Sequence, residues 1–291
     1  MLKLTHSRAV WLMVAVTLMW SIAGVVTRHL EHARSFEVTF WRSLFTLLAL
    51  VVILPALQGR AVFASMRRSG GALWISGVCW SVMFTAFMVA LVLMPVANVL
   101  VTMAAGPLLT ALVSWAFIGH RIAARTWVAI AVAGLGIGWM YGSQMAGLPV
   151  VGTLVALCVP VAAAINWTVV QHSQRLGHRV DLVPAVLVGA VISVLATLPL
   201  AMPFEASRWD LGLLALLGVV QLAIPCVLAV RCGRVLQAPE MALLGLLEVI
   251  FGILLAWLGA GERPAPAVLT GGALVIGALV FNELLGWKEQ T

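Results

Sequence analysis

The sequence predicts an all-α integral membrane protein, in which ten transmembrane helices form two five-helix repeats of opposite orientation. Two observations carry this prediction. Of the 291 residues, 63% are hydrophobic and only 9% are charged, whereas a soluble domain has roughly 25% charged residues. The apolar residues also form continuous runs that are long enough to cross a bilayer and do not alternate as barrel strands do. Lipid is therefore the expected solvent for most of the chain.

Ten apolar runs, each bounded by charged residues, Gly or Pro, define the expected helices. In chain order they cover 9–27, 38–57, 72–92, 96–117, 126–144, 152–171, 182–202, 211–231, 240–259 and 265–286. The first run is longer than the roughly 7–15 apolar residues of a cleaved signal peptide, so we expect it to be a permanent span. Five helices in each half would invert the second half relative to the first. We expect repeats at 1–147 and 148–291, integrated into one transmembrane domain.

One apolar stretch occurs twice. The stretch from Gln237 to Arg263 has a counterpart from Pro95 to Arg121, and both end in Gly-x-Arg. A shift of 142 residues (254 − 112) aligns Leu112, Trp115, Gly119 and Arg121 with Leu254, Trp257, Gly261 and Arg263. The two stretches therefore indicate one structural element used twice.

The basic residues predict the orientation of the chain. If the N-terminus is cytoplasmic, twelve Lys and Arg residues fall on the inner side and four on the outer side, namely Arg28, Arg34, Arg208 and Arg263. This asymmetry follows the positive-inside rule and predicts that both termini are cytoplasmic. The net charge of +7 comes from residues scattered singly through short loops, which argues against a nucleic-acid partner.

Several classes of function are disfavoured. The sequence has no GxxxxGK[ST] phosphate-binding loop, no HExxH and no GxSxG, and its short connections leave no room for a soluble catalytic domain. We therefore expect neither an enzyme nor an ATP-driven pump. The four cysteines lack metal or redox spacing, and the six histidines lie in loops or at helix ends, so we expect no metal and no cofactor. Nothing resembles the filter or charged ring of a channel.

Glu248 is the deepest acidic residue in any apolar run. A charge at that depth costs at least about 2.5 kcal/mol, so such residues tend to be functional or paired. Glu248 is either a site that binds a proton or a substrate amine, or a neutral residue that serves packing alone. Its counterpart 142 positions earlier is Gly106, so the shared packing of the two halves does not require an acid here.

Other polar residues are also candidates for solute contact. Arg42, at the start of the second expected helix, either meets a substrate carboxylate or extends toward the interface. Asn98 and Asn166 lie at membrane depth, where hydrogen bonds between helices are the alternative explanation.

Aromatic residues inside the expected spans suggest an apolar cavity. Trp20, Trp80 and Trp167 fall well inside their helices, and with Phe84, Phe87 and Phe251 they would suit a flat or aromatic solute. Packing against lipid or the protein core is the alternative for each of them. Gly134, Gly138 and Gly142 in the fifth helix, with Ala273 and Gly277 in the tenth, form small-residue ridges. We expect these two helices to pack together as a scaffold.

The motifs resemble a known family. The Gly261-Glu262-Arg263 ending after LLEVIFGILLAWL, the early Trp20 with Gly24, and the glycine-rich fifth and tenth helices are similar to the EamA repeat of the drug/metabolite transporter superfamily. Nearly the whole chain is covered as two such repeats. One departure is His120, which stands where the first repeat usually has glutamate.

The resemblance implies a central cavity between helices one to four and six to nine, with helices five and ten behind it. It also implies alternating-access export of a metabolite across a bacterial inner membrane, and the aromatic amino-acid exporters are the branch this chain resembles. The expected substrate is a small amphipathic molecule, with aromatic or other neutral amino acids first and drugs or nucleotide sugars as alternatives. A non-transporting scaffold or a channel is the alternative from another class. We expect a monomer, with a homodimer as the alternative.

The expected binding residues are Trp20, Trp41, Arg42, Trp80, Phe84, Asn98, Asn166, Trp167 and Phe251, with Glu248 as a proton or polar site.

Overall fold

The computed structural model describes residues 4–33, 35–59, 61–68, 70–118, 123–142, 150–175, 182–233, 235–236 and 238–290. No strand occurs in these ranges. Seven of the described helices are long and apolar enough to cross a membrane, and three shorter apolar helices cover 127–136, 244–260 and 266–278. These helices confirm the all-helical membrane character expected from the composition. Helices suit this environment because their backbone satisfies its own hydrogen bonds in lipid.

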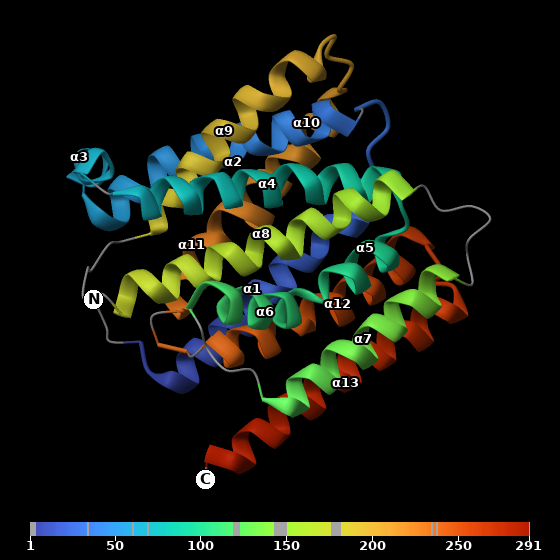
Figure 1. Cartoon of the computed structure of the whole chain (residues 1–291). Coiled ribbons are helices and arrows are strands. Elements are labelled where there is room, and N and C mark those ends of the chain that lie inside the picture. Colours follow the sequence, from blue (N-terminus) through green and yellow to red (C-terminus); the bar gives the residue numbers. More distant parts are fainter. Residues whose placement is uncertain are drawn as a thin grey trace.

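Within the described residues, every expected apolar run is largely helical (Figure 1). The elements are α1 (His6–Thr27), α2 (Ser35–Gln58), α3 (Ala61–Arg68), α4 (Gly71–Leu93), α5 (Val96–Met103), α6 (Gly106–Ile118), α7 (Ala124–Gly142), α8 (Val150–Arg175), α9 (Val183–Ala201), α10 (Arg208–Leu216), the π-helix η1 (Leu217–Ala223), α11 (Ile224–Cys232), α12 (Ala238–Ala260) and α13 (Pro266–Gln290). The short helix α3 was not expected from the sequence.

The fourth expected span is broken, contrary to the prediction of one continuous helix. Helix α5 ends at Met103, two turn residues follow, and α6 begins at Gly106. Pro107 explains the break, because it has no N–H to donate and its ring crowds the carbonyl group of Met103 four residues earlier. The aligned helix α12 is continuous through Glu248. The two copies of the repeated stretch therefore differ at the position where one has Gly106 and the other Glu248.

The helices pack into one bundle with a separate pair on its flank (Figure 1). Helix α4 packs against both α8 and α9, α1 packs along α12, and α2 packs along α9. Glycines bring α4 and α9 close together: a Cβ atom added to Gly189 would lie 2.5 Å from the Cβ atom of Trp80 and 3.0 Å from the carbonyl oxygen of Gly77. The beginning of α1 and the end of α13 lie at the same end of the bundle. We call the opposite end, where residues 28–37 lie, the distal end.

Helices α7 and α13 pack side by side, as expected for a scaffold pair. The expected ridge is wrong, however. Nothing lies within 4 Å of a Cβ atom added to Gly134, Gly138 or Gly277, whereas one added to Gly136 would lie 2.8 Å from the carbonyl oxygen of Gly271. A shift of two residues turns the contact by about 200° around the helix, so small-residue spacing alone selected the wrong face of α7.

Buried acidic side chains hold the loops of the distal end. The carboxylate of Asp210 accepts hydrogen bonds from the backbone N–H groups of Glu31, His32 and Ala33, at 2.8, 3.0 and 3.1 Å. The carboxylate of Glu37 accepts from the N–H groups of Glu205 and Ala206. Each acid lies in the first turn of a helix, where negative charge is favoured, and binds the loop that precedes the other helix.

The Gly-x-Arg ending of α12 also has a structural role at the distal end. Gly261 leaves the helix with a φ angle of 67°, and its N–H donates to the carbonyl oxygen of Trp257. This turn directs Glu262 toward Arg28, whose Nε donates to Glu262 Oε2 at 2.7 Å. Arg28 also donates to the carbonyl oxygens of Leu91 and Met94 at the end of α4. The motif thus joins the distal ends of α1, α4 and α12. The aligned residues 119–121 lie outside the described residues.

Candidate functional site

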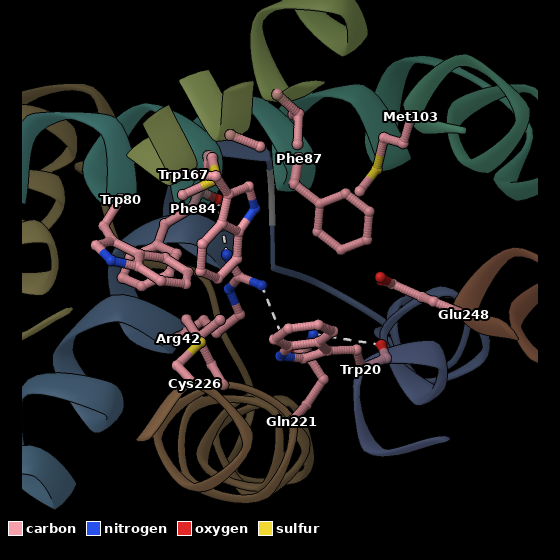
Figure 2. Close-up of a pocket in the computed structure, with 14 residues that line it drawn as sticks. Trp20, Arg42, Trp80, Phe84, Phe87, Met103, Trp167, Gln221, Cys226 and Glu248 are labelled. Carbon is pink, nitrogen blue, oxygen red and sulfur yellow. Dashed lines mark hydrogen bonds between the residues drawn. The ribbon is translucent and has the colours of Figure 1, made fainter. Parts of the chain in front are cut away.

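A cavity of about 190 Å³ lies inside the bundle (Figure 2). It is lined by residues of α1, α2, α4, α5, α8, η1, α11 and α12, namely Trp20, Arg42, Trp80, Met83, Phe84, Phe87, Met103, Val159, Ala163, Trp167, Gln221, Leu222, Cys226 and Glu248. Among the described residues, α7, α9 and α13 contribute none. The expected central position is therefore found, but the seventh expected span, α9, does not line the cavity.

Arg42 is the one basic residue among those that line the cavity. It lies seven residues inside α2, because the helix begins at Ser35 rather than near residue 38 as expected. Its side chain is completely buried, so the interpretation of Arg42 as an interface residue that extends to water is wrong. Nη2 donates to the carbonyl oxygen of Phe84 at 2.7 Å, and Nη1 donates to Gln221 Oε1 at 3.2 Å. Nε is buried and has no hydrogen-bond partner among the described residues.

The π-helix η1 places Gln221 against Arg42. Such wide helical turns are rare and are frequent at functional sites. Gly218 makes the close packing possible, because a Cβ atom added there would lie 2.7 Å from the carbonyl oxygen of Arg42. The hydroxyl of Thr46 donates to the carbonyl oxygens of both Gly218 and Arg42, at 2.9 and 2.8 Å. Gln221 in turn donates from Nε2 to the carbonyl oxygen of Trp20. These bonds connect α1, α2 and η1 at one wall of the cavity.

Aromatic rings form a second wall. Trp80 lies edge-on to Trp167, with ring centroids 6.4 Å apart, and contacts Phe84 at 5.6 Å. The guanidinium carbon of Arg42 lies 6.0 Å from the centroid of the Phe84 ring, which is the limit of a cation–π contact. Phe87 faces the same space in Figure 2. This wall therefore offers flat apolar surface beside a positive charge.

Glu248 reaches the cavity from α12, and Figure 2 shows its carboxylate pointing into the space that Trp20 and Phe87 border. Among the described residues, Glu248 forms no hydrogen bond and no salt bridge. It is the one acidic residue of the lining. A carboxylate without a protein partner in an apolar cavity is suited to a proton or to a cationic group that arrives from solution.

Six of the ten expected site residues line the cavity: Trp20, Arg42, Trp80, Phe84, Trp167 and Glu248. The other four lie elsewhere. Trp41 belongs to an aromatic cluster at the distal end, 5.1 Å from Phe204 between ring centroids, and donates to Glu37. Asn98 is buried in α5. Asn166 accepts from Ser76 at 2.6 Å across the α4–α8 contact. Phe251 is half-buried on another part of α12.

Several lining residues were not expected from the sequence. Met83 and Met103 are flexible apolar side chains that any membrane helix carries, and no sequence pattern distinguished them. Gln221 is different, because it is a lone amide at membrane depth, where hydrogen bonds across helices are the expected role, and it makes such bonds with Arg42 and Trp20. Cys226, about one turn beyond it, is almost completely buried at 1% exposure and also lines the cavity.

Comparison with known proteins agrees with this architecture. The model of the EamA-like transporter family matches residues 7–142 and again residues 150–283. The chain belongs to the EamA-like transporter family. The two matches establish that the EamA repeat occurs twice in this transporter, as the resemblance implied, and identify it as a multi-pass membrane protein of the drug/metabolite transporter superfamily. Members of the EamA-like family are transporters rather than enzymes.

The fold of this EamA-like protein also occurs in solved structures. One of them, described only as "Crystal structure of protein", superimposes with a TM-score of 0.65 over 98% of this chain and 99% of its own, at 19% sequence identity. This likeness concerns the fold alone. No curated protein matches the chain.

Proposed function

We propose that this EamA-like protein is a secondary active transporter that exports small amphipathic metabolites, aromatic or other neutral amino acids foremost, from a bacterial cell. The observation that carries the proposal is the cavity inside the bundle, where three tryptophans and two phenylalanines surround one buried arginine and one glutamate that has no partner among the described residues. A solute with both an aromatic and a charged part would match such a lining.

The size of the cavity supports a small substrate. Its volume of about 190 Å³ is below the roughly 300–1,000 Å³ of sites for drug-sized ligands. A nucleotide sugar or a bulky drug, the alternative substrates, would need a larger space than this conformation offers. A channel or a scaffold, the alternative from another class, would need no lining that combines aromatic and charged side chains in this way.

The membrane arrangement is part of the proposal. Ten spans would cross the inner membrane, and the repeats 1–147 and 148–291 would be related by a pseudo-twofold axis in its plane. Both termini would be cytoplasmic, as the distribution of Lys and Arg favours. A monomer is the expected unit of transport.

Counterflow in proteoliposomes tests the function. Vesicles that contain purified protein and are loaded with unlabelled tryptophan, phenylalanine or leucine should transiently accumulate the labelled amino acid from outside, with saturable kinetics. Protein-free vesicles give the background. If none of the neutral amino acids shows counterflow, with or without a proton gradient, the proposed function is wrong. A non-saturable flux would instead favour the channel alternative.

A further inference from the structure

Two ionisable side chains of opposite sign line the cavity without pairing with each other. Arg42 enters from α2 and Glu248 from α12, and neither is part of a salt bridge among the described residues. In a protein interior a buried cation and a buried anion are expected to be paired, because an isolated charge is strongly destabilised there. Neither of the two therefore has a counter-charge in the described part of the chain.

Arg42 is arranged to bind a carboxylate. A guanidinium group has five N–H donors in a planar fork, and the protein uses two of its nitrogens on neutral acceptors, the carbonyl of Phe84 and the amide of Gln221. Nε remains buried, and no described residue accepts a hydrogen bond from it. Gln221 is itself fixed by Trp20, so the guanidinium is held in place before any ligand arrives. A ligand carboxylate beside the guanidinium would neutralise its charge.

Glu248 is arranged to bind an ammonium group. Its carboxylate points into the cavity from α12, whereas Arg42 enters the cavity from α2 (Figure 2). No N–H or O–H group of a described residue donates to it. The surfaces that border it include Trp20, Phe87 and Met103, which carry no fixed charge. A primary ammonium would bring three donors to these free oxygens.

We infer that the cavity recognises its substrate as a zwitterion, with Arg42 binding the carboxylate and Glu248 the ammonium of an α-amino acid, while the rings of Trp80 and Trp167 contact its side chain. The inference rests on the proposed function and specifies how that site selects its substrate. It predicts that amines without a carboxylate, and acids without an amine, are poor substrates even when they carry the same aromatic ring.

The test uses competition against labelled tryptophan counterflow in proteoliposomes. The competitors are tryptophan, tryptamine (without the carboxylate) and indole-3-propionate (without the amine), all with the same indole. For the wild-type protein, tryptophan should compete at least about tenfold better than either analogue, because each analogue lacks one charge-assisted interaction.

Charge-removing variants assign the two roles. Arg42→Gln should abolish the preference for tryptophan over tryptamine, and Glu248→Gln should abolish its preference over indole-3-propionate. Arg42→Lys keeps the charge and should keep part of the first preference. Arg208→Gln and Glu31→Gln are matched controls, because both residues are exposed at the distal end, and both variants should retain the wild-type ranking. If a variant fails to fold, the ranking of the three competitors on the wild-type protein still decides the inference.

The outcomes separate the two proposals. If no neutral amino acid shows counterflow, the proposed function itself is wrong. If tryptophan is transported but all three indoles compete equally well, the function stands and zwitterion recognition is wrong. The same conclusion follows if Arg42→Gln and Glu248→Gln weaken all three competitors by the same factor. A preference for tryptophan that each variant removes in its own direction supports the inference.

Discussion

Replacing Gly218 by alanine should separate η1 from α2 and damage the cavity wall at Arg42. An added Cβ atom would lie 2.6 Å from the Cβ atom of Phe45, 2.7 Å from the carbonyl oxygen of Arg42 and 3.0 Å from the backbone nitrogen of Thr46. Ordinary contact begins at 3.4 Å, so the helices would have to move apart by up to 0.8 Å (3.4 − 2.6). Because two of the three atoms belong to the backbone, no side-chain rotation relieves the overlap.

The energetic cost follows from these contacts. Overpacking of this kind costs about 1–3 kcal/mol, and the alanine regains at most about 1 kcal/mol of helix propensity. The bond from Arg42 to Gln221, already 3.2 Å long, would exceed hydrogen-bonding distance after such a shift, with a further loss of about 1 kcal/mol. We therefore expect a net destabilisation of about 2 kcal/mol, which corresponds to a decrease in Tm of roughly 4 °C.

Thermal unfolding in detergent and counterflow in vesicles measure the effect. Gly218→Ala should lower both the Tm and the apparent affinity for the transported amino acid. Gly212→Ala is the matched control, since it lies in the same helical segment and nothing is within 4 Å of its added Cβ atom. The control should leave the Tm unchanged or raise it. If Gly218→Ala and Gly212→Ala have the same Tm and affinity, the reasoning about the α2–η1 contact is refuted.

Three further predictions concern the distal end. Asp210→Asn should destabilise the protein by about 1.5–3 kcal/mol in thermal unfolding, because four backbone N–H groups lose a charged acceptor; an effect no larger than that of the exposed Glu31→Gln would contradict this. Glu262→Gln should cost less than about 1 kcal/mol by the same measurement, since the ion pair with Arg28 is partly exposed; a decrease in Tm as large as that of Asp210→Asn would show that the pair matters more than its exposure suggests. Gly261→Val should cost roughly 1–2 kcal/mol, because its φ angle of 67° is strained for a branched residue, and an unchanged Tm would argue against that turn.

The helices could be predicted from the sequence because each apolar run must satisfy its own backbone hydrogen bonds in lipid. Their interruptions were harder to predict. The break before α6 has a local cause in Pro107, whose effect on a helix is visible in the sequence itself. The π-helix η1 has no such local cause, since its geometry depends on the contact of Gly218 with α2.

The site also depended on how each helix is oriented and on how deep each residue lies in it. Glu248 and Phe251 are three residues apart on α12, at neighbouring positions of its surface, yet only Glu248 lines the cavity. In a soluble protein the polar face of a helix would reveal this choice, because the other face is apolar. Here both lipid and protein interior are apolar, so the apolar residues around α12 carry little information about its rotation. The same reason explains why the small-residue ridge on α7 was assigned to the wrong face.

The sequence by itself determined that the chain is a helical membrane protein, that one EamA repeat occurs twice, and that Glu248 is an acid which the repeat does not require. These conclusions depend on composition and local pattern, which the bilayer constrains directly. Only the tertiary structure decided that Arg42 is buried beside Gln221, that Trp41 lies away from the cavity, and that Glu248 faces it without a partner in the described part of the chain. Those facts depend on close contacts between helices that are distant in sequence. Glycines such as Gly218 permit these contacts, but a glycine in the sequence does not indicate which helix will pack against it.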